Sequence, residues 1–518
     1  MFEDIEFYGW FGEFDKEILL LVFLPLAGAF IEIILELLKS EKSKSMDTAK
    51  HVVAGIFAAS VFGVAIVLVD KLLHDESFVY AYRGQVLSLD LLSGFFAAVF
   101  TFIGLVATLY SIYYMGDRSS LGLYYALLLS LIAGLNTITL ATDFFTLFIA
   151  WEAMVMAGYA LVSFNKDTKE AVEASFKYFI MSGFGSLLVL YGMTILYGLT
   201  GTLTFSGVNA ALGSAEPTFQ LYFATVLIVL GFGVTGSLVL LNQWLVDAHP
   251  AAPTPISAVL SGIVVKAGAY AIIRILYTAL PNMILKGVSP TSGEVGELLM
   301  ILGIITMFEG NIMVYSQFLR SDIKDIKRIL AYSTTVHLGL IMFAIGIGTT
   351  LGLGAGLFHV VSHAMGKALL FILAGVFMHQ VHSRDLVKMK GIGHASPFYG
   401  AAFLIGVLSL GAVPPTAGFV SEVLIFLAAF QAEYRLLAVL GIINTMLALA
   451  GYLWLTKYIV FEKPSEEVKQ LMTANPGIKI HVWNAIPVIL LALATVLIGI
   501  YPEFVMEPAI RAAESLTP

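Results

Sequence analysis

The chain has 518 residues, of which 59% are hydrophobic and only 12% are charged, and its mean hydropathy is +0.90. A soluble chain carries about 25% charged residues, so this composition excludes a soluble globule, a disordered chain and a nucleic-acid-binding protein. One crossing needs about 20 apolar residues, which leaves room for well over ten crossings. The sequence therefore predicts an all-α, multi-pass protein of the lipid bilayer.

The chain contains no cysteine. Disulfides, thiolate metal ligands and cysteine-held iron–sulfur clusters are thereby excluded, so any redox chemistry must belong to another polypeptide. The N-terminal segment 1–17 is acidic and has no basic region ahead of an apolar run. It does not read as a cleavable signal peptide, and the first apolar run is expected to remain as a membrane span.

Apolar runs bounded by charge, Gly or Pro predict fourteen spans. The run at 398–430 is long and is interrupted at Pro414-Pro415, so the count stays open by one. The spans are expected at 18–38, 51–73, 91–115, 123–141, 144–163, 173–199, 220–243, 254–280, 296–318, 327–348, 353–380, 398–430, 435–461 and 484–506.

The distribution of Lys and Arg predicts the orientation. Loops that follow odd-numbered spans hold seventeen of these residues, whereas the opposite side, termini included, holds six. Positive charge marks the cytoplasmic side of a membrane protein. Both termini are therefore expected outside the cell, with the chain in the plasma membrane.

Ionisable residues also fall inside the spans or at their ends. Each costs about 2.5–3.5 kcal/mol at mid-bilayer, so they must face one another or water. Such rows of Glu, Lys and His are what a proton relay needs. They are Glu152, Lys177, Lys266, Arg274, Glu309, His337, His359, His363, Lys367, Glu422 and Lys457.

Several of these residues also have a structural interpretation. Arg274 and Lys457 lie near span ends, where long side chains can reach the interface. His359 and His363 are four residues apart, a spacing that suits a metal, but no third ligand is evident and a hydrogen-bonded relay is favoured. Glu309 is either an inward polar plug beside Gly310 or a relay member.

Two spans read as broken helices. The run GAVPPTAGFVSE places two prolines and two glycines before Glu422, and GFGVTGS at 231–237 is rich in glycine. Interrupted spans at matching positions in two halves indicate an inverted-repeat transporter. The repeats are expected over 123–281 and 296–461, after N-terminal spans in 1–122 and before a cytoplasmic loop and last span in 462–518. Lys177 and Lys367 then occupy equivalent positions.

These motifs resemble the antiporter-like subunits of Mrp-type cation/proton antiporters, respiratory complex I, and membrane-bound hydrogenase and sulfane reductase complexes. The resemblance covers about residues 90–460. It rests on DFFTLFIAWEAM (143–154), WLVDAHPAAPTPISAVLSGIVVKAGAYAIIR (244–274), DIKDIKRILAYSTTVHLGL (322–340), HVVSHAMGKALLF (359–371) and PPTAGFVSE (414–422).

The resemblance implies fourteen helices, two inverted five-helix repeats, two discontinuous helices, and half-channels joined by a polar axis. It gives proton-translocating roles to the residues that match the family motifs, with accessory roles for Asp247 and His249 near the cytoplasmic entrance. The translocating set is Glu152, Lys177, Lys266, His337, His359, His363, Lys367 and Glu422.

One position departs from the family pattern. The lysine of the seventh helix falls on Thr235, which can pass on a hydrogen bond but cannot carry a proton charge. Either Lys177 pairs with Glu152 instead, or the first half-channel is silent. Glu309 is an extra carboxylate in the ninth helix that could alter ion preference.

The leading interpretation is a proton- or sodium-translocating, antiporter-like subunit of a redox-driven respiratory complex. The chain itself is expected to hold no cofactor, because iron–sulfur clusters and a metal centre would lie in partner subunits. The alternatives are a subunit of an Mrp-type sodium/proton antiporter and a membrane scaffold that has lost transport.

Overall fold

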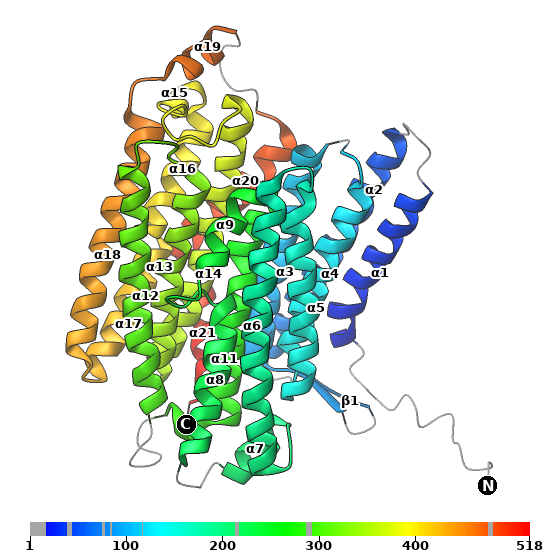
Figure 1. The fold of residues 1–518 in the computed structure, drawn as a ribbon, viewed down its shortest axis with the longest axis vertical. Helices are drawn as coiled ribbons and strands as arrows, with labels where there is room; N and C mark the ends of the chain where they lie inside the picture. Colours follow the sequence, from blue (N-terminus) through cyan, green and yellow to red (C-terminus); the bar gives the residue numbers. More distant parts are fainter. Residues whose placement is uncertain are drawn as a thin grey trace.

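The computed structural model describes residues 17–38, 44–74, 78–82, 85–116, 118–212, 217–285, 293–474 and 480–517. Almost all of these residues are helical (Figure 1). The acidic N-terminal segment and some charges used for the orientation lie outside the described residues, namely Lys16, Lys39, Lys42, Arg83, Lys286 and Lys479.

In the described part of the chain, twelve helical stretches are long and apolar enough to cross a membrane, which confirms a multi-pass membrane protein. These stretches are α1 (Glu17–Leu37), α2 (Lys44–Leu73), α3 (Leu91–Met115), α4 (Leu121–Leu140), α5 (Phe144–Val162) with the turn Ser163–Asn165, α6 (Lys169–Thr200), Thr254–Ala279, α12 (Glu294–Leu319), α13 (Ile326–Gly346), α14 (Thr350–Val381), α18 (Arg435–Thr456) with Lys457–Phe461, and α20 (Val482–Ile500).

The stretch Thr254–Ala279 is α10 (Thr254–Val259) and α11 (Val265–Arg274), with π-helical turns over Leu260–Val264 and Ile275–Ala279. Three shorter apolar helices are α8 (Phe219–Thr235), α16 (Pro397–Leu410) and α17 (Ala417–Gln431). The remaining elements are α7 (Phe205–Leu212), α9 (Gln243–Ala251), Pro281–Met283, α15 (Ile392–Ala395), α19 (Glu466–Ala474), α21 (Glu503–Glu514), and the antiparallel strands β1 (Phe78–Tyr82) and β2 (Gln85–Leu89).

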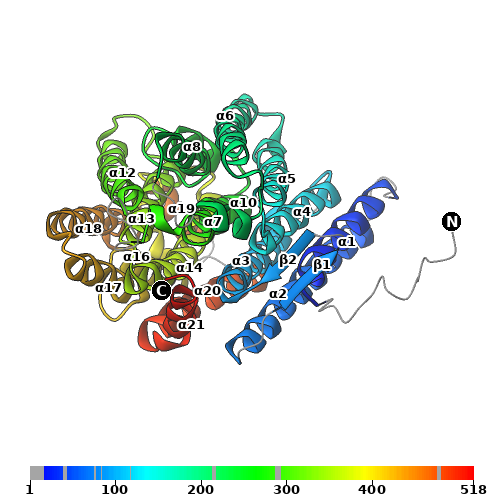
Figure 2. The same cartoon turned by 90° about the horizontal axis from the view of Figure 1, so that it is seen from below.

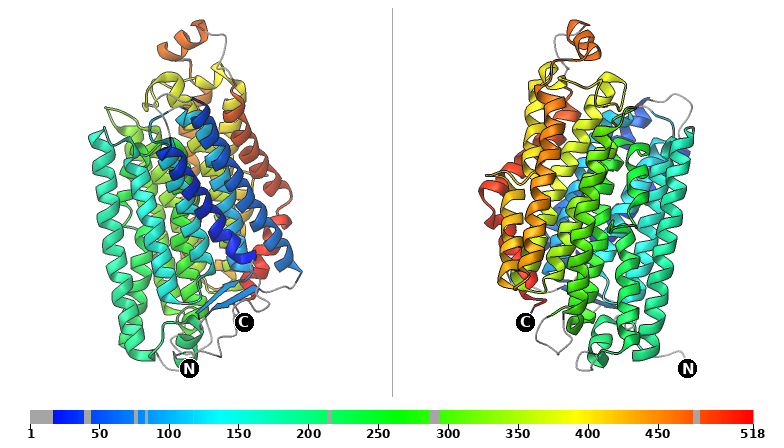
Figure 3. Two further views of the ribbon diagram at one scale, coloured as in Figure 1. Left: turned by 90° about the vertical axis from the view of Figure 1, so that its right-hand side faces the viewer. Right: turned by 60° about the vertical axis from the view of Figure 1, so that its left-hand side comes forward.

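Helices from both halves of the chain surround a buried centre. The apolar windows of α14 and of Thr254–Ala279 are wholly buried, whereas about a third or less of α1 and α2 is buried. Figure 2 shows α14 and α10 inside the ring of helices, with α1 and α2 at one edge and α17 and α18 at the other. Figure 3 shows α1 and α2 crossing that edge as a separate layer. The spans that carry Lys266, His359, His363 and Lys367 are therefore the innermost helices.

Two helices are interrupted where the sequence predicts breaks. The helical conformation stops at Thr235 and resumes at Gln243, and it stops again between Leu410 and Ala417. At the second break a Cβ on Gly418 would overlap the carbonyl of Ser409, so the two half-helices can pack this closely only because residue 418 is glycine. Both breaks free backbone groups from helical hydrogen bonds, and Ser237, Asn242 and Gly411 at their ends are buried in protein.

Arg274 corrects one expectation. The sequence suggested that it reaches the membrane interface, but only 7% of its side chain is exposed. Its guanidinium donates to both carboxylate oxygens of Asp90, at 2.6 and 2.7 Å, and to Ser93. Asp90 precedes α3 as its N-cap. Arg274 therefore faces inward, and its ion pair with Asp90 connects the C-terminal end of α11 to the start of α3.

We expect the change Asp90→Asn to lower the stability of the chain by about 1–3 kcal/mol, because it leaves the Arg274 charge without its partner. Burial would raise the pKa of Asp90, but Arg274 and the Ser93 donors lower it to about 2. The stability that Asp90 contributes is therefore complete above about pH 4 and is lost as the pH falls towards 2. Thermal unfolding at pH 7 and pH 3 checks both statements. An unchanged unfolding temperature in the variant at pH 7 would contradict them.

Candidate functional site

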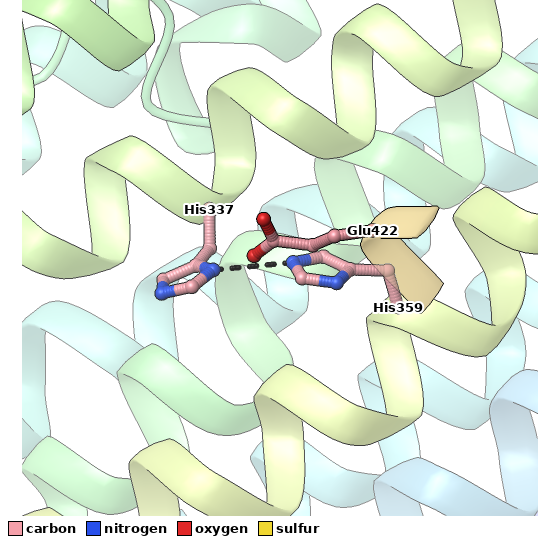
Figure 4. Close-up of side chains that lie close together, drawn as sticks. All are labelled: His337, His359 and Glu422. Carbon is pink, nitrogen blue, oxygen red and sulfur yellow. Dashed lines mark hydrogen bonds between the residues drawn. The ribbon is translucent and has the colours of Figure 1, made fainter. Parts of the chain in front are cut away.

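Two histidines and a glutamate meet in the buried centre (Figure 4). His337 comes from α13, His359 from α14 and Glu422 from the first turns of α17. Nδ1 of His337 and Nε2 of His359 share a hydrogen bond of 3.2 Å. One ligand atom from each of the three residues lies within 4.8 Å of the others. The structure therefore joins the relay candidates of the tenth and eleventh predicted spans to the broken twelfth span.

A tyrosine extends this group towards Lys367. The hydroxyl of Tyr452, on α18, lies 2.9 Å from Nε2 of His337 and 3.1 Å from Nζ of Lys367. Lys367 also donates to the hydroxyl of Ser333 and, at 3.2 Å, to the carbonyl of Leu330. Lys367 and His337 are therefore bridged by one protonatable hydroxyl.

At the other end the group reaches two hydroxyls of neighbouring helices. Nδ1 of His359 lies 2.8 Å from Oγ of Ser421, the residue before Glu422. The hydroxyl of Thr445 donates to Oε2 of Glu422 at 2.6 Å. We call the sequence Lys367–Tyr452–His337–His359–Ser421, with Glu422 beside it, the central chain. In it, hydrogen bonds join four helices without a gap.

Lys266 lies on the inner helix next to a π-helical turn. Its ammonium donates to the carbonyl of Ser261, which belongs to the turn Leu260–Val264. A π turn frees backbone carbonyls and is often found at functional sites. The hydroxyl of Ser261 lies 2.8 Å from that of Thr334 on α13. In the described part of the chain neither Lys266 nor Lys367 forms an ion pair, although both are fully buried.

Two further predicted histidines are buried without hydrogen bonds. Within the described residues, neither ring nitrogen of His363 or His249 has a partner. The ring of His363 lies 4.7 Å from that of His337, so His363 borders the central chain. The ring of His249 stacks on Phe371 at 4.7 Å, one turn from Lys367 on α14.

The predicted members of the first half are not paired with one another. Glu152, on α5, accepts a hydrogen bond from Ser186 on α6. Nζ of Lys177 instead lies 2.8 Å from Glu173 and 2.8 Å from Asp247, and 48% of its side chain is exposed. The suggestion that Lys177 replaces the missing lysine as the partner of Glu152 therefore does not fit this structure.

Asp247, predicted as an accessory residue, lies in a cluster of ion pairs. It pairs with Lys177 and, at 2.9 Å, with Arg328 at the start of α13, so it links the two halves. Nearby, Arg384 pairs with Glu170 at 2.9 Å. This cluster lies at the end of the bundle where the predicted cytoplasmic loops are.

Thr235 and Glu309 lie on the two sides of the first break. Thr235 is buried and is the last residue of α8. Glu309 accepts a hydrogen bond of 2.8 Å from Asn242, the residue before α9. The backbone N–H of Val239 donates to Thr306, one turn before Glu309. Glu309 is therefore tied to the unwound segment by a hydrogen bond.

Sequence reasoning missed several buried polar residues. Tyr452 was not distinguished from the aromatic residues around it, although a buried tyrosine hydroxyl needs a partner. Lys327 was counted as a loop charge, but its ammonium is buried and donates to the carbonyl of Ala252 at 2.8 Å. Glu32, inside the first span, was overlooked, and it is fully buried on α1.

The centre also offers the donor types of a metal site. The sequence offered no third metal ligand beside His359 and His363. In the structure, His337 and Glu422, which are distant from His359 in the sequence, lie close to it in space. Each of the three side chains, however, already has a hydrogen-bonding neighbour: Tyr452, Ser421 or Thr445. The arrangement therefore suits the passage of protons along hydrogen bonds without requiring a bound ion.

A nearly all-helical membrane bundle with two broken helices and a buried row of Lys, Tyr, His and Glu is the arrangement expected of antiporter-like membrane proteins. The family described as "NADH:quinone oxidoreductase/Mrp antiporter, TM" matches residues 141–448. Because this match covers more than half of the chain, the protein belongs to that family, as its motifs suggested.

Curated relatives and solved structures are similar over nearly the whole chain. The "F(420)H(2) dehydrogenase subunit N" of Methanosarcina mazei is 30% identical over 85% of this chain and 87% of its own length. A subunit of the Na(+)/H(+) antiporter of Alkalihalophilus pseudofirmus is 28% identical over 84% of each chain. A chain of the membrane-bound sulfane sulfur reductase, an archaeal respiratory complex, superposes with a TM-score of 0.84 at 27% identity, covering 97% of this chain and 98% of that one. A chain of the Mrp complex from Dietzia shares the fold, with a TM-score of 0.85 at 21% identity over 97% of this chain and 98% of that one.

Proposed function

We propose that the chain is a proton-translocating, antiporter-like subunit of a multisubunit, redox-driven membrane complex. The observation that carries the proposal is the central chain, in which Lys367 and His359 are connected through Tyr452 and His337 by buried hydrogen bonds. Buried ionisable groups are expensive in a membrane protein, and they mark the paths of ions and protons.

The geometry suggests how a proton passes. The ammonium of Lys367 donates to the hydroxyl of Tyr452, and that hydroxyl can hand its own proton to Nε2 of His337. His337 then releases the proton on its other nitrogen, Nδ1, to Nε2 of His359. An oxygen of Glu422 lies within 4.8 Å of a nitrogen of each ring, so a small movement of its side chain would let it take up the proton at the break between α16 and α17. The neutral lysine left behind is ready to be protonated again.

The names of the relatives favour a redox complex. Subunit N of an F(420)H(2) dehydrogenase and subunit N of an NADH-quinone oxidoreductase, in Trichlorobacter lovleyi, are each 30% identical to this chain. The chain has no cysteine for an iron–sulfur cluster, so the clusters and the metal centre of such a complex would belong to partner subunits. Redox chemistry there would drive ion movement here.

The proposal includes the finer architecture. Together with α8, and with α16 and α17 taken as one broken span, the long helices correspond to fourteen crossings. The two inverted repeats would cover 123–281 and 296–461, each containing one of the breaks. The excess of Lys and Arg in the loops after odd-numbered spans supports a plasma-membrane orientation with both termini outside.

A sodium/proton antiporter subunit is the second candidate, favoured by the similarity to a subunit of an Na(+)/H(+) antiporter. Thr235 offers only a hydroxyl where the family has a lysine, which weakens the first half-channel. This position motivates the third candidate function, a scaffold without transport. The uninterrupted hydrogen bonds of the second half argue against a scaffold. Purifying the native complex in mild detergent and identifying its partners by mass spectrometry separates the first two, because only a redox-driven complex would contain iron–sulfur subunits.

The change Tyr452→Phe tests the proposed path. It removes the one hydroxyl between Lys367 and His337 while keeping the ring in place. Proton uptake by proteoliposomes that contain the whole complex is expected to fall by about 10²-fold, the usual contribution of a positioned proton-transfer group. Tyr458→Phe is the control, since the ring of Tyr458 contacts Lys390 and lies outside the central chain. Full proton uptake by the Tyr452→Phe complex would refute the path.

A further inference from the structure

A second polar site lies away from the central chain, where α3 and α14 end and α20 begins. It is a cavity of about 220 Å³ lined by Tyr110, Tyr113, Tyr114, Arg118, Gly375, Met378, His379 and His382. The loops at this end of the bundle are those predicted to face the cytoplasm. Nothing in the proposed proton path uses these residues.

The polar side chains of the cavity are donors of hydrogen bonds. The guanidinium of Arg118 lies over the ring of Tyr114, 5.5 Å from its centre, and donates to the neutral amide of Asn165 at 3.3 Å. The ring of Tyr113 lies edge-on to His379 at 5.6 Å. Among the described residues that line the cavity there is no carboxylate. Guanidinium, imidazole and phenol groups without a carboxylate are suited to an anion.

Further imidazole groups lie at the same place. The ring of His481, the residue before α20, contacts the ring of Tyr113 at 4.7 Å. The rings of His379 and His382 are 6.2 Å apart. One arginine and three histidines from three segments therefore lie in or beside the cavity, against the rings of Tyr113 and Tyr114 or against one another.

His382 is also held in an unfavourable backbone conformation. It follows the last residue of α14 with φ of 51° and ψ of 33°, in the left-handed region. Glycine is the usual residue at this position of a helix end, because a Cβ makes the conformation costly. Strained residues of this kind cluster at functional sites. A histidine at this position, with its side chain lining the cavity, indicates that the imidazole contributes something that glycine would not.

We propose that this cavity binds the phosphate group of an anion, with Arg118 as its main charged contact and His379 and His382 as further donors. With about 220 Å³ of space, the cavity is large enough to admit a phosphate group and its nearest ester carbons. Phosphate of this kind is supplied by an anionic lipid headgroup or by free inorganic phosphate. Basic pockets between membrane helices at the cytoplasmic side typically hold such headgroups.

The test uses the purified whole complex in nanodiscs. One arm compares phosphatidylglycerol with phosphatidylcholine as the lipid, and the other adds inorganic phosphate to the phosphatidylcholine sample. Native mass spectrometry counts the retained phosphatidylglycerol, and the thermal unfolding temperature reports stabilisation by either probe. Stabilisation by phosphatidylglycerol alone assigns a lipid headgroup, and stabilisation by inorganic phosphate assigns the free ion.

Two variants and one control make the test specific. Arg118→Gln is expected to weaken binding at least about tenfold, the loss of one charge-assisted contact. His382→Gly is expected to leave the unfolding temperature without the anion equal or higher, since it relieves the backbone, while reducing the shift that the anion causes. Arg320→Gln is the control, because Arg320 pairs with Asp322 in an exposed loop. If neither probe binds the wild-type complex, or if both variants bind it as tightly as the control does, the phosphate site is refuted.

Discussion

The change Lys266→Met is expected to abolish ion movement by the complex, with a loss of about 10²-fold or more in proton uptake by proteoliposomes. Lys266 is fully buried, and its ammonium contacts a backbone carbonyl of the neighbouring π turn. Methionine keeps much of the volume but cannot take up or release a proton. Because a buried ammonium without a counter-ion is costly, the variant is expected to assemble with equal or higher thermal stability.

Proton uptake should therefore be lost while the thermal stability of the complex is kept or raised. Replacing a purely structural lysine would not produce this combination. Lys457→Met is the matched control, since 64% of the Lys457 side chain is exposed and its partner, at 3.5 Å, is Glu462. If the Lys266→Met complex assembles and pumps normally, the buried lysine has no part in translocation.

The change Glu422→Gln is expected to have the second large effect. Glutamine preserves the shape of the side chain and can still accept the hydrogen bond from Thr445, but it cannot exchange a proton with His337 or His359. Proton uptake should fall by about 10²-fold, while the amounts of all subunits in the complex stay the same.

Glu433→Gln is the control for this variant. Glu433 follows α17 and is exposed, and it pairs with Arg435 at 2.8 Å. If both glutamine variants transported protons at the wild-type rate, Glu422 would be a structural residue of the break, held there by Thr445.

The sequence predicted the two breaks and three of the buried charges, Lys266, Lys367 and Glu422, for a physical reason. Pro, Gly and ionisable residues stand out in an apolar run because each is costly there unless the fold compensates. Glu422 beside the prolines at 414–415 and Lys266 within an unbroken apolar run were therefore visible from the sequence. Residues whose chemistry is ordinary in a membrane helix, such as Tyr452 and Thr445, gave no such signal.

Pairing between distant segments was not predictable. Arg274 looked like a residue that reaches the interface because it ends an apolar run, and only the fold shows that Asp90 faces it. Lys177 looked like a partner for Glu152, yet it turns towards Asp247. The position of a residue within a span predicts how deep its side chain lies in the membrane. It does not predict which helix packs against that side chain.

The contact of Lys266 with a carbonyl, in place of a carboxylate, has a consequence beyond its own helix. A carboxylate beside an ammonium would cancel most of its field at a distance, whereas a carbonyl dipole cancels little. Two unit charges about 10 Å apart interact by roughly 1.7 kcal/mol at an effective dielectric constant of about 20, which changes a proton-binding equilibrium by more than about tenfold. If Lys266 carries protons as proposed, the arrival or loss of a proton there would change the electrostatic potential at neighbouring sites that it never touches. One half of the molecule would then influence the other with no side chain having to move between them.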